Sequence, residues 1–123
     1  NAVAYSHAGG RIGVRAGRES SAGDVPARWW LEVQDRGIGI APDDLPHVFE
    51  RSFRAEAARA HRPDGSGLGL HIARSLVRSH GGDISIASTP DAGTTLRLWL
   101  PVLETAATAP VQAAASAVEA RRA

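Results

Sequence analysis

The strongest local signal in the sequence is the alternation of hydrophobic and polar side chains, which predicts half-buried β-strands. Residues 11–16 and residues 28–34 alternate in this way. Residues 83–88 and residues 94–100 are two further strand candidates, and the turn sequence TPDAG between them indicates a hairpin. The polar stretch 17–27 contains Gly, Ser and Pro, and therefore predicts a loop between the first two strands.

Helices are expected at three places along the chain. Residues 1–6 (NAVAYS) have the pattern of the last turns of a helix, which the glycine pair 9–10 ends. Pro42 is well placed to start a short helical stretch. Residues 54–64 are charged and alanine-rich with little apolar content, so we expect a mobile loop there. We call residues 54–66 the lid.

The third helix is expected to begin near Gly67. Its apolar residues Leu68, Ile72 and Leu76 recur every four positions, which predicts that they form the buried face. Arg74 then lies on the side that faces water. We expect this helix to pack on the sheet through its apolar stripe.

Length and composition favour one globular domain and exclude several kinds of chemistry. The chain has 123 residues, 43% of them hydrophobic and 22% charged, which suits one domain with one core. It has no cysteine and no lysine, so thiol catalysis, zinc–thiolate sites and P-loop lysines are excluded. The net charge of +1 indicates no nucleic-acid partner and no contact with a membrane surface.

The two ends of the chain differ from its body. The chain starts at Asn1 without a methionine, and we expect it to be a piece of a longer protein or a processed product. Residues 104–123 are alanine-rich and low in complexity, and they predict a disordered tail. The folded domain is therefore expected to cover residues 1–103.

The sequence DRGIGI (residues 35–40) follows directly on a predicted strand. Asp35, at the end of that strand, can accept a hydrogen bond from an exocyclic amine and so select adenine. Gly37 and Gly39 allow the backbone to approach a flat ligand because no side chain intervenes. A plain turn with a solvated aspartate is the alternative interpretation.

The sequence GSGLGL (residues 65–70) precedes the third predicted helix. Backbone N–H groups at a helix start lack acceptors and carry partial positive charge, which favours phosphate oxygens. The spacing differs from the dinucleotide-binding fingerprint, and the lysine of a P-loop is absent. A flexible helix entry without a ligand is the alternative interpretation.

Four segments together resemble a known family. NAVAYS, DRGIGI, FERSFR and GSGLGL are similar, in that order, to the N, G1, F and G2 boxes of the ATP-binding catalytic domain of bacterial sensor histidine kinases. That domain belongs to the superfamily of gyrase, heat-shock chaperone and mismatch-repair ATPases. The resemblance covers residues 1–103 and implies an α/β two-layer sandwich, with helices on one face of a mixed, largely antiparallel sheet. It also implies that the domain is incomplete at its N-terminus.

The resemblance implies a role for each matching position. Asn1 would coordinate magnesium, Tyr5 would pack beside adenine, and Asp35 would bind the adenine amine. The implied ATP-binding residues are Asn1, Tyr5, Asp35, Gly37, Gly39, Phe49, Arg54, Gly65, Gly67, Leu68, Gly69 and Leu70. Asn1 is the one implied metal ligand, and the implied cofactors are ATP and Mg²⁺.

Two positions depart from the family pattern. Ala4 stands where the family usually has a basic residue that helps to hold phosphate, and Ser52 stands where it usually has a second aromatic residue. Four arginines in or near the lid are candidates to supply the missing charge: Arg51, Arg54, Arg59 and Arg62.

The function implied by the resemblance is donation of the γ-phosphoryl group of ATP to a histidine on a separate dimerisation domain, with a response regulator receiver domain downstream. None of the five histidines here stands in a phosphoacceptor motif. The resemblance further implies a cytoplasmic domain of a cell-membrane sensor. Two alternatives stay open: an ATP hydrolase of the same superfamily, and a nucleotide-binding or docking module without catalysis.

Overall fold

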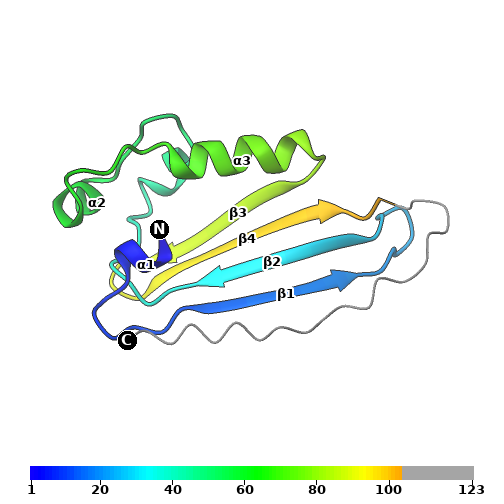
Figure 1. Cartoon of the computed structure of the whole chain (residues 1–123), viewed down its shortest axis with the longest axis horizontal. Coiled ribbons are helices and arrows are strands. Elements are labelled where there is room, and N and C mark those ends of the chain that lie inside the picture. Colours follow the sequence, from blue (N-terminus) through cyan, green and yellow to red (C-terminus); the bar gives the residue numbers. More distant parts are fainter. Residues whose placement is uncertain (104–123) are drawn as a thin grey trace.

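A computed structural model describes residues 1–103, which form a four-stranded antiparallel sheet with helices on one face (Figure 1). The strands are β1 (Gly13–Glu19), β2 (Arg28–Gln34), β3 (Asp83–Thr89) and β4 (Gly93–Pro101), in the spatial order β1-β2-β4-β3. The helices are α1 (Ala2–Tyr5), the 3₁₀ turn η1 (Leu45–His47), α2 (Glu56–His61) and α3 (Gly69–Ser79). The expected two-layer α/β fold is confirmed. The tail expected at 104–123 lies outside the described residues.

The strand register places an apolar row on the face that carries the helices. Val14 pairs with Val33, Val33 pairs with Leu96, and Leu96 pairs with Ile86. Because side chains alternate along a strand, these four residues point to the same side of the sheet. Helix α3 packs over β3 and β4 on this side (Figure 1).

Strand β1 was expected at residues 11–16, but it begins at Gly13 and ends at Glu19, and contacts on the opposite face of the sheet explain the later end. Trp30 pairs with Trp99 on β4, and the guanidinium of Arg97 lies 5.0 Å from the centre of the Trp30 ring. A Cβ atom at Gly17 would lie 2.8 Å from that ring, so any other residue there would have to displace the ring. Glu19 receives a 2.9 Å hydrogen bond from Arg97. These contacts extend β1 through Glu19 into the stretch expected to be a loop.

The buried face of α3 differs from the expected one. Ile72 and Leu76, expected to be buried, are 50% and 58% exposed. The residues that are half-buried instead are Leu70, His71, Ala73, Arg74 and Val77. Arg74, expected to face water, lies with its guanidinium 4.7 Å from the centre of the Phe49 ring. The expected stripe is wrong at Ile72 and Leu76, because α3 carries apolar residues on two sides and the half-buried side is that of Leu70, Ala73 and Val77.

Two other expectations need correction. The lid is not a continuous loop, because residues 56–61 form α2. Helix α1 ends at Tyr5, well before the glycine pair 9–10, because Ser6 is already extended (φ −69°, ψ 147°) and forms a β-bridge with Gly37. Within residues 1–103, no helix has the length and hydropathy of a membrane span.

Candidate functional site

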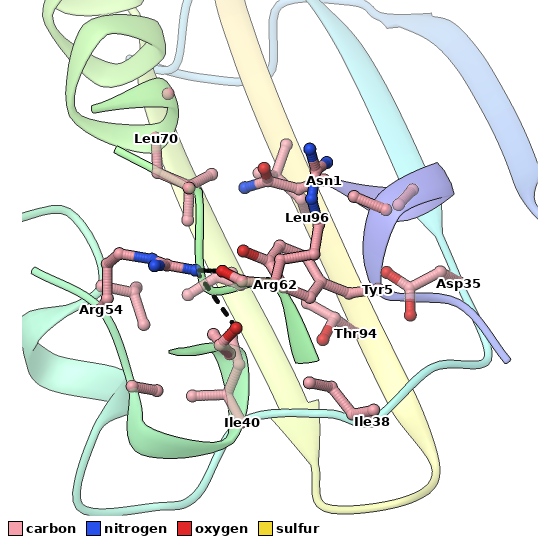
Figure 2. A pocket seen from close by; sticks show the side chains of 18 of the residues that line it. Asn1, Tyr5, Asp35, Ile38, Ile40, Arg54, Arg62, Leu70, Thr94 and Leu96 are labelled. Carbon is pink, nitrogen blue, oxygen red and sulfur yellow. Dashed lines mark hydrogen bonds between the residues drawn. The ribbon is translucent and has the colours of Figure 1, made fainter. Parts of the chain in front are cut away.

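A cavity of about 960 Å³ lies between the helix-bearing face of the sheet, α1 and the lid (Figure 2). Tyr5 and Asp35 stand on one side of it, and Arg54 and Leu70 on the other (Figure 2). Of the residues expected at a nucleotide site, those that line the cavity are Asn1, Tyr5, Asp35, Gly39, Arg54, Gly65, Gly67, Gly69 and Leu70. Three expected residues, Gly37, Phe49 and Leu68, do not line it.

The end of α1 is bound to the DRGIGI segment by backbone hydrogen bonds. The N–H of Ile38 donates to the Tyr5 carbonyl at 3.1 Å, and Ser6 and Gly37 form an antiparallel bridge. A Cβ atom at Gly37 would collide with the Tyr5 carbonyl. Gly37 is therefore glycine because two backbone segments touch there, and this contact positions Tyr5 at the cavity.

Gly39 makes a second close approach of this kind, on the other side of the segment. Its φ is +67°, and a Cβ atom there would collide with the Thr89 carbonyl in the β3–β4 hairpin. The N–H of Ile40 donates to Ser88 Oγ at 2.9 Å. The glycine spacing thus lets the segment fit between α1 and the hairpin, a use that the sequence pattern did not indicate.

Asp35 is held at the end of β2 with part of its carboxylate unused. Its N–H donates to the Thr94 carbonyl at 2.9 Å, and its Oδ1 accepts a 3.0 Å hydrogen bond from the Gly37 N–H. The other carboxylate oxygen has no hydrogen-bond partner within residues 1–103. Asp35 can therefore accept a donor from a ligand without breaking its existing bonds.

The other side of the cavity is formed by the start of α3. The backbone N–H groups of Gly69, Leu70 and His71 have no acceptor among residues 1–103, and the first helical bond is from Ile72 to the Leu68 carbonyl. Free N–H groups at the positive end of an 11-residue helix favour an anion. The 3.1 Å bond from the Ser52 N–H to the Gly67 carbonyl connects this entry to the FERSFR segment.

The two phenylalanines of FERSFR are placed differently from expectation. Phe49 lies outside the cavity, in a shallow neighbouring groove, where His71 Nδ1 is 3.2 Å from its carbonyl oxygen. Phe53 is the one that lines the cavity. His71 also lies in the neighbouring groove and not in the cavity.

Sequence reasoning also missed most of the apolar wall. The cavity-lining apolar residues that were not expected include Ile38, Ile40, Val48, Phe53, Leu96 and, on β1, Val14. The isoleucines alternate with the glycines of DRGIGI, so the motif itself contained the signal. An apolar wall around a few polar groups is typical of small-molecule sites.

The arginines of the lid divide into two groups. Arg54 and Arg62 line the cavity, as does Ala4, whereas Arg51 and Arg59 do not. The guanidinium of Arg54 is occupied by backbone carbonyls, and that of Arg62 lies 3.7 Å from the Asp64 carboxylate. Arg62 is therefore the better placed arginine to supply positive charge to a ligand.

Asn1 is the residue that could hold a metal. It precedes α1 without making a side-chain cap, so its amide oxygen is available. Among the described residues there is no group of three or more His, Cys, Asp or Glu that could hold a metal. Mg²⁺ typically takes one or two protein oxygens together with substrate phosphates. Asn1 suits that mode of binding.

Comparison with known proteins agrees with this geometry. The model of the histidine kinase-, DNA gyrase B- and HSP90-like ATPase family matches residues 1–104. The chain belongs to this family. Domains of this family bind ATP.

Within this family, the relatives most similar in sequence include sensor histidine kinases. The chain is 43% identical over 103 residues to the sensor-like histidine kinase SenX3 of Mycobacterium tuberculosis, covering 84% of this chain and 24% of that protein. It is 38% identical over 104 residues to the sensor histidine kinase WalK of Bacillus subtilis, covering 85% of this chain and 16% of WalK. It thus spans a quarter or less of these relatives.

A solved structure supports the fold as well as the family. The mycobacterial sensor histidine kinase MprB matches with a TM-score of 0.67 and 38% sequence identity, over 81% of this chain and 64% of that chain. The similarity therefore holds for sequence and for three-dimensional arrangement together.

Proposed function

We propose that this chain binds Mg²⁺–ATP in the cavity and donates the γ-phosphoryl group to a histidine on a separate helical dimerisation domain, in two-component signal transduction. The observation that carries the proposal is the polarity of the cavity. A carboxylate with a free oxygen stands on one side, and the N-terminus of a long helix stands on the other. Membership of the family and the names of its relatives support this direction.

At the adenine end, Asp35 would accept a hydrogen bond from the exocyclic amine. Guanine carries an oxygen at the corresponding position, so the same carboxylate would repel it. Tyr5 and Ile38 would contact the base from α1 and from the DRGIGI segment. The apolar wall keeps water from competing for the Asp35 hydrogen bond, which strengthens it.

At the phosphate end, the free N–H groups of α3 and the guanidinium of Arg62 would neutralise negative charge. Mg²⁺, held by Asn1 and the phosphates, would add the remaining neutralisation. In the transfer, the unprotonated ring nitrogen of a histidine would attack the γ-phosphorus while the bond to the ADP oxygen breaks and ADP leaves. The proton on the other ring nitrogen would then be released to water. Such a reaction needs positioning and charge stabilisation and little covalent chemistry from the protein.

The partners follow from this chemistry. The acceptor histidine would come from a dimerisation domain of the same or another chain, and a response regulator receiver domain would then take the phosphoryl group. We propose that the longer protein is a cell-membrane sensor with this domain in the cytoplasm. We assign no nucleic-acid partner to the domain.

A second candidate is a nucleotide-binding module without catalysis. The observation that favours it is Ala4, which lines the cavity at the position where the family usually has a basic residue. On this alternative, the chain would bind ATP with its partner domain present and transfer nothing.

The test is incubation of the chain with Mg²⁺ and γ-labelled ATP, with and without a histidine-bearing dimerisation domain of a sensor histidine kinase. We expect label on the added domain only, as an acid-labile and base-stable phosphate. ATP binding without transfer would favour the non-catalytic module, and release of free phosphate would favour a hydrolase. Label on the chain alone, or a base-labile product, would contradict the kinase.

A further inference from the structure

The side chain of Arg54 is bound inside the lid by several backbone carbonyls. It donates from Nη1 to the Pro63 carbonyl at 3.1 Å and from Nη2 to the Ala58 carbonyl at 3.2 Å, and Nη2 also donates to the Arg62 carbonyl. Figure 2 shows Arg54 at the cavity, with its hydrogen bonds to other lining residues dashed. The guanidinium is therefore engaged by the protein itself.

The Ala58 carbonyl lies in the last turn of α2, where it also accepts the Arg62 N–H at 2.9 Å, and the Arg62 and Pro63 carbonyls follow directly after the helix. Helix α2 has six residues and no side-chain N-cap, so local interactions alone stabilise it weakly. A guanidinium has five N–H donors in a rigid plane, and it can satisfy several carbonyls at once. Arg54 thus caps α2 from outside the helix.

The same side chain also contacts the glycine segment that leads into α3. A Cβ atom at Gly65 would lie 2.8 Å from Arg54 Nη2, and one at Gly67 would lie 2.9 Å from Arg54 Cγ. Arg54 is therefore enclosed by the end of α2 on one side and the glycines on the other. Its position fixes where each lies relative to the other.

The C-terminal end of α2, which Arg54 caps, also reaches the opposite wall of the cavity. The His61 ring lies 5.9 Å from the Tyr5 ring, centre to centre. The lid therefore touches α1 beside the residue that faces the adenine end. Because α2 contacts Arg54 on one side of the cavity and Tyr5 on the other, its position determines how far apart the two sides lie.

We propose that Arg54 is a positioning residue. It holds the lid in place by capping α2, and it thereby positions the glycine segment, residues 65–67, to bind phosphate. The effect on phosphate rests on the proposed nucleotide function, whereas the contacts of Arg54 with α2 and with the glycine segment are made by the protein's own groups. It differs from the role implied by the family resemblance, in which Arg54 belongs to the ATP-binding set.

Three variants of the full chain test this role. Arg54→Lys keeps the positive charge and loses the planar set of donors, and Arg54→Gln loses the charge as well. Arg59→Lys is the matched control, because Arg59 lies on α2 outside the cavity and its side chain makes no hydrogen bond within residues 1–103. The first readout is amide hydrogen exchange without nucleotide, with the amides of β2 and β4 as the internal measure of folding.

We expect Arg54→Lys and Arg54→Gln to speed exchange at Arg62 and Gly65 by about tenfold, the effect of losing one or two net hydrogen bonds. The second readout is affinity for ATP and for adenosine. Both variants should weaken ATP about tenfold and adenosine less than twofold, because the lid sets the phosphate end. Arg59→Lys should change neither readout.

The possible outcomes distinguish the positioning role of Arg54 from the proposed nucleotide function. Wild-type exchange in Arg54→Lys, or wild-type ATP affinity in Arg54→Lys together with a loss in Arg54→Gln, would overturn the positioning role in favour of direct charge on phosphate. Fast exchange in both variants, together with no ATP binding by the wild-type chain, would support the positioning role of Arg54 and refute the nucleotide proposal.

Discussion

Asp35 uses one carboxylate oxygen to fix its own loop, and the other oxygen, which has no hydrogen-bond partner within residues 1–103, is the one that we propose binds adenine. Replacement by alanine removes both, and a hydrogen bond to a charged group contributes roughly 1.5–3 kcal/mol. We therefore expect Asp35→Ala to weaken ATP binding by about ten- to a hundredfold, measured by calorimetry on chain whose fold is verified by circular dichroism. Asp24→Ala, at an exposed loop position, is the control and should bind like wild type. Equal affinity in both variants would refute the adenine role.

A substitution at Gly37 tests the backbone contact with Tyr5 that positions this tyrosine at the cavity. Because an added Cβ would collide with the Tyr5 carbonyl, Gly37→Ala should force the two backbones apart and destabilise the chain by about 1–3 kcal/mol. Gly13→Ala is the matched control, since nothing lies within 4 Å of an added Cβ there. Denaturant unfolding followed by tryptophan fluorescence measures both. A Gly37→Ala chain as stable as Gly13→Ala would show that the contact is not required.

For single residues, the sequence predicted which positions lie at the cavity better than it predicted what those residues contact. Asp35 and Gly39 line the cavity as expected. The glycines were expected to approach a ligand, and they approach the backbone of α1 and of the hairpin instead. The Tyr5–Gly37 contact joins residues 32 apart in sequence and the Gly39–Thr89 contact joins residues 50 apart, so no local pattern indicates them.

At the scale of elements, Asp83, the first residue of β3, connects this strand to α3. Its carboxylate binds Arg78 at 3.0 and 3.1 Å and Arg74 at 3.4 Å, and its Oδ1 accepts the Ile84 N–H at 2.8 Å. The bond from Arg78, aided by the Ile84 N–H, lowers the pKa of Asp83 from 3.8 to about 2. The folded chain therefore holds the carboxylate ionised at pH values where the unfolded chain is protonated.

This pKa fixes the sign of a pH dependence. A lowered pKa stabilises the fold above pH 3.8, and that stabilisation is lost as the pH falls toward 2. Asp83→Asn should lower the melting temperature by about 2–5 °C at pH 6, a modest value because the carboxylate is 36% exposed. The difference from wild type should shrink as the pH falls from 4 to 2. Asp24→Asn should show no difference at either pH, and a gap for Asp83→Asn that stays constant with pH would contradict the assignment.

Elements stabilised by their own pattern were predicted, and elements stabilised by distant groups were not. Strand β2 spans residues 28–34 as its alternation indicated. Helix α2 was missed because its alanines and charges form no apolar stripe and its cap comes from Arg54. The orientation of α3 was missed because Ile72 and Leu76 are larger than Ala73, yet the sheet meets the Ala73 side.

In the whole molecule, three segments distant in sequence form one cavity: α1, the DRGIGI segment and the lid with the start of α3. Each brings a different group, namely the Asn1 amide, the Asp35 carboxylate and the free N–H groups of α3. The family resemblance predicted this assembly, because it supplied the order of the four motifs. Composition and periodicity alone would have indicated only a small α/β domain.

The central claim is that one nucleotide spans this cavity, with adenine at Asp35 and phosphates at the start of α3. Amide hydrogen exchange of the full chain, with Mg²⁺ and saturating non-hydrolysable ATP analogue or adenosine, tests it most directly. The ATP analogue should protect both residues 35–40 and residues 65–71, and adenosine should protect residues 35–40 alone. Protection by adenosine at residues 65–71 alone, or no protection by the ATP analogue in either segment, would contradict the claim.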